Sequence, residues 1–510
     1  MTRASCASDS KPKLRADSLA DSVAMLMALT AVQPLVSFAR GLLFCRWLRP
    51  EQLGQWDMAL GFLTLLAPLV VLGIPGSLGR YVEYYRQRGK LGRYLALSTA
   101  TTIVLTLAAI AVLIVSASSF ARLIFGTGGA ASMIGWMAIC LGPLVAFGFI
   151  TELLNAARLY RVVSLLQLLR SAGFLLLGAT ALFAWSMSAT SVLAAYGLAS
   201  ALSVAVGLYW IRHADWSSAQ GVPATSDSIW LKVMPFALWV WMSNNLSNLF
   251  EIVDRYMIVH YSGLSSDDAL ALVGNYHSSR VVPLLIVIFA TMLGSILLPH
   301  LSHAWETGRR QAVDVQLRLA LKLLAFALST GAAVFLLIAP LLFSTLLENK
   351  YQAGLAVLPW TLVYCIWFGL AMVAEMYLWI REEARLASVA LFLSMLLNVG
   401  LAVVLLPRYG LLGAVLACSA SKLTLLLLVY GFNRTLGLTG DAAIWLSVAL
   451  PAALLLGARP ALAVYAVVLL WAVASPRWLC AGEKQQLAHV LGGYWDKLLS
   501  LVGRRQPAAA

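Results

Sequence analysis

The chain has 510 residues, of which 61% are hydrophobic and only 11% are charged. With a mean hydropathy of +0.85 it carries more apolar surface than a soluble fold can bury, which excludes a water-soluble globular protein. The formal net charge of +14 would suggest nucleic acid as a partner only if the basic residues formed one patch, so their positions have to be examined first.

Fourteen apolar stretches, each able to cross a bilayer as a helix of about 20 residues, follow one another along the chain. The polar segment before the first stretch runs directly into it, which predicts a retained span and no cleavable signal peptide. The sequence therefore predicts an all-α integral membrane protein with about 14 transmembrane helices. The predicted spans lie near residues 19–45, 56–78, 94–117, 131–156, 162–185, 190–211, 233–260, 275–301, 317–346, 354–379, 386–406, 410–431, 441–457 and 460–475.

The basic residues lie mainly between alternate spans. If both termini are cytoplasmic, most of the 36 lysines and arginines fall on the cytoplasmic side, as the positive-inside rule expects. The positive charge then reports topology, and nucleic acid is not expected as a partner.

A repeat relates the two halves of the chain. Leu53-Gly54-Gln55-Trp56 is matched by Val273-Gly274-Asn275-Tyr276 at an offset of 220, and Val192-Leu193-Ala194 recurs as Val415-Leu416-Ala417 at an offset of 223. Both matches occupy the same place relative to their spans. The pattern predicts two pseudo-symmetric six-helix lobes of the same orientation around a central cavity, followed by two extra helices.

The predicted organisation has six parts. These are a cytoplasmic N-terminal tail (1–18), an N-lobe with helices 1–6 (19–213), a cytoplasmic linker (214–232), a C-lobe with helices 7–12 (233–433), the extra helices 13 and 14 (434–476) and a cytoplasmic tail (477–510). Within the last part, Lys484 to Leu501 fits either an amphipathic surface helix or a disordered tail, and the sequence leaves both open.

The seventh predicted span carries polar side chains on one helical face. At spacings of four, three and four, this face presents Asn244, Asn248, Glu251 and Arg255, with Asp254 beside them. An ionised group in hydrocarbon costs roughly 3 kcal/mol on insertion scales, so such residues usually face a bundle interior or a watery cavity. Either an internally neutralised cluster that joins helices or a functional site would explain the pattern.

Other predicted spans contain charged residues as well. Cations exceed anions among them, so a cavity that they line should suit an anionic ligand, most simply a phosphate or diphosphate held by guanidinium groups. Each residue taken singly could instead extend to a headgroup or pair locally. The charged residues inside these spans are Arg40, Glu152, Arg170, Arg280, Glu375 and Lys422. The predicted substrate-binding set is Arg40, Arg255, Arg280, Lys422, Asn244 and Asn248.

An enzyme is the competing class. The chain has no Walker pattern, no HExxH and no plausible nucleophile set, and its six cysteines form no CxxC pair. His300 and His303 lie one helical turn apart and could bind a metal, but histidines at a membrane interface are commoner. We therefore predict no catalytic residue, no cofactor and no metal.

Three stretches resemble the polysaccharide-export flippases. Residues 39–82, ARGLLFCRWLRPEQLGQWDMALGFLTLLAPLVVLGIPGSLGRYV, are similar to the opening of that family: an arginine in the first span, a short link ending in a glycine-aromatic step, and a Gly-Ile-Pro corner. The family's usual glycine before Pro50 is Arg49 here. Val253-Asp254-Arg255 and residues 405–417, LLPRYGLLGAVLA, resemble two further family motifs, and the similarity covers about residues 20–435.

The resemblance implies a Wzx-like flippase of the MATE-like superfamily, which also holds multidrug exporters and peptidoglycan-precursor flippases. Such a protein turns an undecaprenyl-diphosphate-linked oligosaccharide over the bacterial inner membrane for O-antigen or exopolysaccharide synthesis. The alternatives are a multidrug or cation antiporter and a peptidoglycan-precursor flippase. Expected partners are the lipid-linked glycan, membrane lipids, and the polymerase and glycosyltransferases of the same pathway. A proton or sodium ion could couple through Glu251, Asp254 or Glu375.

Overall fold

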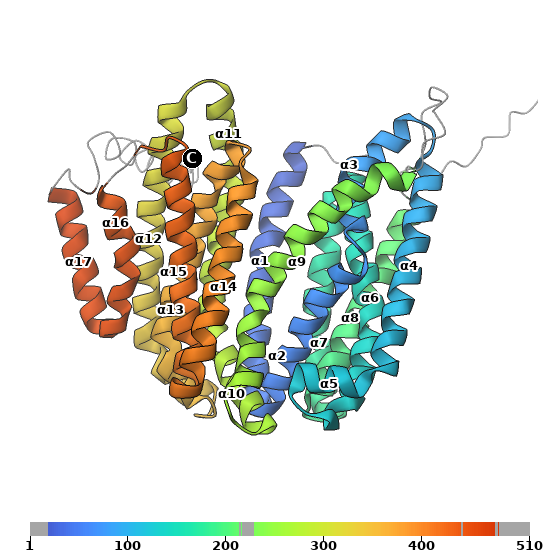
Figure 1. Ribbon diagram of the computed structural model, residues 1–510, viewed down its shortest axis with the longest axis horizontal. Helices are drawn as coiled ribbons and strands as arrows, with labels where there is room; N and C mark the ends of the chain where they lie inside the picture. Colours follow the sequence, from blue (N-terminus) through green and yellow to red (C-terminus); the bar gives the residue numbers. More distant parts are fainter. Residues whose placement is uncertain (1–18, 214–215, 217–228, 440–441, 475–477, 479–510) are drawn as a thin grey trace, which may run out of the picture. The chain divides into compact units, whose positions relative to one another are not determined.

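The computed structural model describes residues 19–213, 216, 229–439, 442–474 and 478 (Figure 1). Apart from Trp478, the predicted tails lie outside this range, as do most of the predicted linker and the segment Lys484 to Leu501. Within it the chain forms seventeen α-helices and no strand. The helices are α1 (Leu19–Trp47), α2 (Pro50–Val70), α3 (Ile74–Gln87), α4 (Leu91–Val115), α5 (Ala117–Phe125), α6 (Ala131–Ala156), α7 (Tyr160–Ala184), α8 (Ala189–His213), α9 (Ile229–Tyr261), α10 (Ser266–Arg280), α11 (Pro283–Glu306), α12 (Arg310–Leu341), α13 (Gln352–Ile380), α14 (Ala384–Tyr409), α15 (Leu411–Thr435), α16 (Ala442–Ala449) and α17 (Ala458–Ala474).

The helices confirm the all-α membrane class. Ten helical segments among the described residues are long and apolar enough to cross a bilayer. Each of the fourteen predicted spans overlaps a helix, but the count of fourteen is not confirmed, since α16 with its 3₁₀ continuation (Leu450–Leu456) and α17 are shorter apolar segments. Helix α9 is 33 residues long, and its three asparagines and three charged residues between positions 244 and 255 lower its hydropathy.

The second predicted span, residues 56–78, is wrong at both ends. Helix α2 begins at Pro50 and stops at Val70, and the short α3 begins at Ile74. Between them Leu72 and Gly73 have φ angles of +48° and +71°, which a helix cannot continue through. A Cβ on Gly73 would lie 2.1 Å from the backbone oxygen of Ala237 in α9, so only glycine fits this position.

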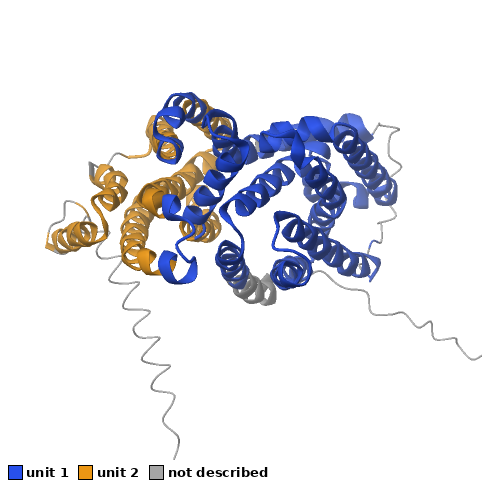
Figure 2. Ribbon diagram, turned by 90° about the horizontal axis from the view of Figure 1, so that it is seen from below, with its two compact units in different colours: residues 1–281, 343–354, 398–414 blue, residues 282–342, 355–397, 415–510 orange. Residues whose placement is uncertain are grey.

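The contacts divide the chain into two compact units, coloured separately in Figure 2. Unit 1 comprises residues 1–281, 343–354 and 398–414, and in it α2 packs on α10 while α8 packs on α6 and α7. Unit 2 comprises residues 282–342, 355–397 and 415–510, and in it α12 packs on α11, α16 and α17. These units are groups of mutual contacts, and the predicted lobe bounds stay a prediction.

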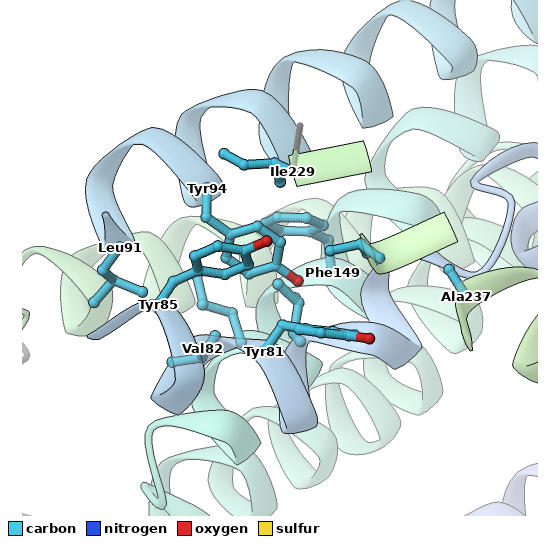
Figure 3. Close-up of a cluster of buried hydrophobic side chains, with 11 residues drawn as sticks. Tyr81, Val82, Tyr85, Leu91, Tyr94, Phe149, Ile229 and Ala237 are labelled. Carbon is cyan, nitrogen blue, oxygen red and sulfur yellow. The ribbon is translucent and has the colours of Figure 1, made fainter. Parts of the chain in front are cut away.

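A cluster of buried hydrophobic side chains, four of them aromatic, holds α3 against α4, α6 and α9 in unit 1 (Figure 3). The rings of Tyr85 and Tyr94 stack with their centroids 4.8 Å apart, and both side chains are buried. The hydroxyl of Tyr81 donates a hydrogen bond of 2.9 Å to the backbone oxygen of Lys232. Buried tyrosines contribute large apolar area and keep one polar tip bonded, so the cluster fixes the start of α9 beside α3 and α6.

Helix α10 begins with a capping serine. Ser265 Oγ accepts a hydrogen bond of 3.3 Å from the backbone N–H of Asp268 and donates one of 2.6 Å to the Asp268 carboxylate. Because losing such a cap costs about 1 kcal/mol, Ser265→Ala should lower the free energy of unfolding by that amount, measured as a lower thermal midpoint of the purified protein. Ser295→Ala, at an exposed serine bonded only within its own turn, is the control, and an equal midpoint for both variants would contradict the prediction.

Candidate functional site

A buried carboxylate joins three helices of unit 1. Asp57 in α2 is 2% exposed, and its two oxygens contact different partners. Oδ2 lies 3.0 Å from Nε of Arg255 in α9, and Oδ1 lies 2.9 Å from Nδ1 of His277 in α10. Removing one partner of so buried an ion pair strongly destabilises a protein, because the other charge stays buried without compensation. These contacts therefore hold α2, α9 and α10 together.

The neighbouring acid in α9 has a separate set of partners. Asp254 is 5% exposed and accepts hydrogen bonds from the hydroxyl of Tyr276 in α10, at 3.1 Å, and from Nδ2 of Asn398 in α14, at 2.8 Å. The guanidinium of Arg280 lies 5.1 Å from the Tyr276 ring centroid. Asp57, Asp254, Arg255, Tyr276, His277 and Asn398 are called the polar network below.

Beside the polar network, α2 and α10 approach each other through a reciprocal glycine contact. A Cβ on Gly54 would lie 1.9 Å from the backbone oxygen of Leu270, and one on Gly274 would lie 2.0 Å from that of Pro50. Gly274 follows Gly54 by 220 positions, and the same interval separates Leu270 from Pro50 and His277 from Asp57. The repeat offset found in the sequence therefore corresponds to a local two-fold contact between these two helices.

A second charged site in unit 1 consists of two arginines on aromatic faces. The guanidinium carbon of Arg40 in α1 lies 4.5 Å from the Phe174 ring centroid, and that of Arg170 in α7 lies 4.0 Å from the Phe147 ring centroid. The two cations lie on neighbouring rings, since Arg170 is also 6.0 Å from the Tyr196 ring centroid, which is 5.0 Å from that of Phe174. Neither arginine has a carboxylate partner among the described residues. Two positive charges without a protein counter-charge form a group able to bind an anion. Arg40 and Arg170 are called the arginine pair below.

The other predicted site residues on α9 and in unit 2 have their own surroundings. On α9, Asn244 and Glu251 are exposed and Asn248 is half-buried, so helical spacing alone does not bring them to the partners of Arg255. In unit 2, the ammonium of Lys422 lies 4.1 Å from the Phe368 ring centroid. Also in unit 2, Glu375 accepts a hydrogen bond of 3.1 Å from the indole of Trp379.

Four members of the polar network are not predicted by a search for charges inside apolar runs: the uncharged Tyr276 and Asn398, and the ionisable Asp57 and His277. Asp57 stands next to the first residue of its predicted span and resembles an interface residue there. His277 lies in α10, whose last residues fall within the predicted span 275–301, so the sequence does not show α10 as a separate helix. The repeat offset is the signal that could have found them, because it places Asp57 and His277 in equivalent positions.

The described residues contain no group of three histidine, cysteine, aspartate or glutamate side chains that could hold a metal ion. His300 and His303, which lie one turn apart in α11, are both exposed.

Comparison with known proteins bears on the fold and on the family. No curated protein sequence matches the chain. Among solved structures, the lipid II flippase MurJ in an inward closed conformation is similar at a TM-score of 0.69, with 12% identity over 89% of this chain and 100% of that one. An inward-facing multidrug resistance transporter of the MATE family is similar at a TM-score of 0.64, with 15% identity over 81% of this chain and 97% of that one.

A transporter of the MOP superfamily from Pyrococcus furiosus is similar at a TM-score of 0.57, with 13% identity over 81% of this chain and 94% of that one. At such identities these likenesses show the fold, which is that of a multi-pass membrane protein. The family is shown by a match of the sequence to a family model, which confirms the predicted resemblance. Because residues 19–305, more than half of the chain, match the polysaccharide biosynthesis protein family, the chain belongs to that family.

Proposed function

We propose that the protein is a flippase that carries a polyprenyl-diphosphate-linked oligosaccharide across the bacterial inner membrane, for O-antigen or exopolysaccharide synthesis. The proposed mechanism is alternating access of two six-helix lobes, with both termini cytoplasmic. Family membership and the MATE-like and MurJ-like fold support the class of transporter. The single observation that supports an anionic lipid as substrate is the arginine pair.

The chemistry of the arginine pair suits a diphosphate. A charged group without a counter-ion is costly inside a membrane protein, so an arginine kept in that state usually has a functional partner. A guanidinium binds phosphate oxygens through two parallel hydrogen bonds, which a lysine cannot reproduce. The aromatic rings below Arg40 and Arg170 hold the cations by cation–π attraction and leave their N–H edges for a ligand.

The polar network has a different part in the proposal. Arg255 is already paired with Asp57, so its predicted contact with the substrate would require that pair to open during the transport cycle. Arg280, Lys422, Asn244 and Asn248 remain proposed substrate contacts. Glu251, Asp254 and Glu375 remain the proposed sites of proton or sodium coupling, and Glu251 is the exposed one of the three.

The arginine pair gives the direct test. Arg40→Ala and Arg170→Ala should each lower the rate of flipping of undecaprenyl-diphosphate-linked oligosaccharide in proteoliposomes about 10-fold to 100-fold, because each removes hydrogen bonds to a charged group. Lysine at either position should restore part of the rate. Arg88→Ala is the matched control, since Arg88 also stacks on a ring, that of Tyr84, but is exposed.

Three outcomes would contradict the proposal. Wild-type flipping by the double variant Arg40→Ala/Arg170→Ala would remove the arginine pair from substrate binding. A purified protein that exports cationic dyes and ignores lipid-linked sugar would belong with the multidrug antiporters instead. Flipping of lipid II in preference to other lipid-linked glycans would identify a peptidoglycan-precursor flippase, which shares the diphosphate.

A further inference from the structure

Unit 1 contains a polar cavity at the point where α2 stops. The cavity has a volume of about 220 Å³, and α2, α3, α6 and α9 form its walls. One water molecule needs only about 10–15 Å³ of such space, whereas pockets for drug-sized ligands run to roughly 300–1,000 Å³. The cavity is therefore large enough for a small ligand.

The walls of the cavity combine a carboxylate, an amide and an indole. Glu152 of α6 is the one charged residue among those that line it, and Asn244 and Trp241 of α9 line it as well. Within the described part of the chain, Glu152 and Asn244 have no hydrogen bond or ion pair that would occupy their side chains. Trp241 is fixed in place because its indole N–H donates a hydrogen bond of 2.9 Å to the backbone oxygen of Leu69.

The missing side chain of Gly148 leaves part of the cavity open. Gly148 of α6 lines the cavity, and a Cβ added there would have no atom within 4 Å. The break between α2 and α3 borders the cavity as well, since Val71 and Gly73, on either side of Leu72, line it.

A neighbouring groove differs from the polar cavity in the chemistry of its lining. It has a volume of about 430 Å³, lies between α4, α6 and α8, and shares Val145 and Phe149 with the polar cavity. Its lining contains three threonines and no charged residue. The groove suits a hydrocarbon chain, whereas the polar cavity exposes a carboxylate that such a chain would desolvate without compensation.

We propose that the polar cavity binds one sugar ring of the lipid-linked glycan, an inference that depends on the proposed function. The carboxylate of Glu152 would repel a diphosphate, so the ligand is the uncharged, hydroxyl-rich part of the substrate. A carboxylate accepts two hydroxyl protons, an amide both donates and accepts, and an indole covers the apolar face of a pyranose. In this proposal the polar cavity binds the sugar selectively, and the arginine pair binds the diphosphate.

Two variants change the cavity in different ways. Glu152→Gln removes the charge and keeps the shape, and Gly148→Val adds a side chain at a position where the Cβ meets no atom within 4 Å. Gly142→Val is the matched control, because Gly142 lies on the same helix, lines the apolar groove and has its nearest neighbour 4.0 Å from the added Cβ. The three variants should unfold at similar temperatures.

The probes are undecaprenyl diphosphate alone and a panel of undecaprenyl-diphosphate-linked glucose, galactose and N-acetylglucosamine, titrated against purified protein in nanodiscs. The wild type should bind at least one sugar-linked lipid about tenfold more tightly than the bare lipid, the contribution of hydrogen bonds to a charged group. Glu152→Gln and Gly148→Val should reduce this preference to about twofold and leave the affinity for the bare lipid unchanged. Gly142→Val should keep the preference.

The outcomes separate the two proposals. Binding of the bare lipid with no preference for any sugar, or a preference that survives Gly148→Val, would overturn the sugar site and leave the flippase. Tetraphenylphosphonium binding that is lost in Glu152→Gln would make the cavity an organic-cation site and overturn the sugar proposal. A protein that binds neither the bare nor the sugar-linked lipids would overturn the flippase, and the sugar site with it.

Discussion

Gly54→Ala and Gly274→Ala are each expected to prevent α2 and α10 from packing, and so to leave little folded protein in the membrane. The added Cβ would lie 1.9 Å from the Leu270 oxygen in the first case and 2.0 Å from the Pro50 oxygen in the second. Both obstacles are backbone atoms, which cannot rotate away as a side chain would. We expect a loss of more than about 4 kcal/mol in the free energy of unfolding, which few single substitutions reach.

The measurement is the yield and thermal midpoint of detergent-purified protein. Gly135→Ala in α6 is the control, because its Cβ would have no neighbour within 4 Å. As a glycine-to-alanine change within a helix it should raise stability by up to about 1 kcal/mol. Near-normal yield and midpoint for Gly54→Ala would show that α2 and α10 do not approach as closely as described.

Asp57→Ala should have the next largest effect on stability. It leaves the guanidinium of Arg255 and the imidazole of His277 without the carboxylate that lies 3.0 and 2.9 Å from them. Breaking a buried pair by removing one partner costs about 3–5 kcal/mol, since the remaining charge stays desolvated. The thermal midpoint of Asp57→Ala should fall accordingly, and Asp57→Asn, which keeps the size, should lose nearly as much.

A double-mutant cycle separates the ion pair from packing. If the stability loss comes from an uncompensated Arg255, then Asp57→Asn/Arg255→Gln should be more stable than Asp57→Asn alone. Additive losses in the double variant would mean that Asp57 and Arg255 stabilise the helices independently. Glu251→Gln, at an exposed acid on the same helix, should change stability by less than about 0.5 kcal/mol.

The helices could be predicted from the sequence because their signals are local. A run of apolar residues and the basic residues that flank it are enough to place a span. Hydropathy does not predict the break after Val70, because the apolar run continues through Leu72 and Gly73, and only their positive φ angles end the helix. The sequence does not predict α10 as a separate helix, because its last residues fall within the next predicted span.

The site was harder to predict because its contacts join distant parts of the chain. Helical spacing correctly indicates that Asn244, Glu251 and Arg255 share one face of α9, but not which part of that face is covered. Arg255 is buried against Asp57, 198 positions earlier, while Glu251, one turn away, is exposed. Helical periodicity does not indicate which distant residues will be partners. The repeat offset indicates this only for Asp57 and His277, which it places in equivalent positions.

The reciprocal contact of Gly54 and Gly274 has a consequence for the origin of the chain. Two separate copies of one shorter polypeptide could make the same contact as a homodimer, with each copy offering the same residue to the other. In such an ancestor one codon would have served both sides of the dimer axis. A chain formed by fusing two such copies would carry two separate codons, but both positions would still require glycine, because the 1.9 and 2.0 Å approaches leave no room for a Cβ.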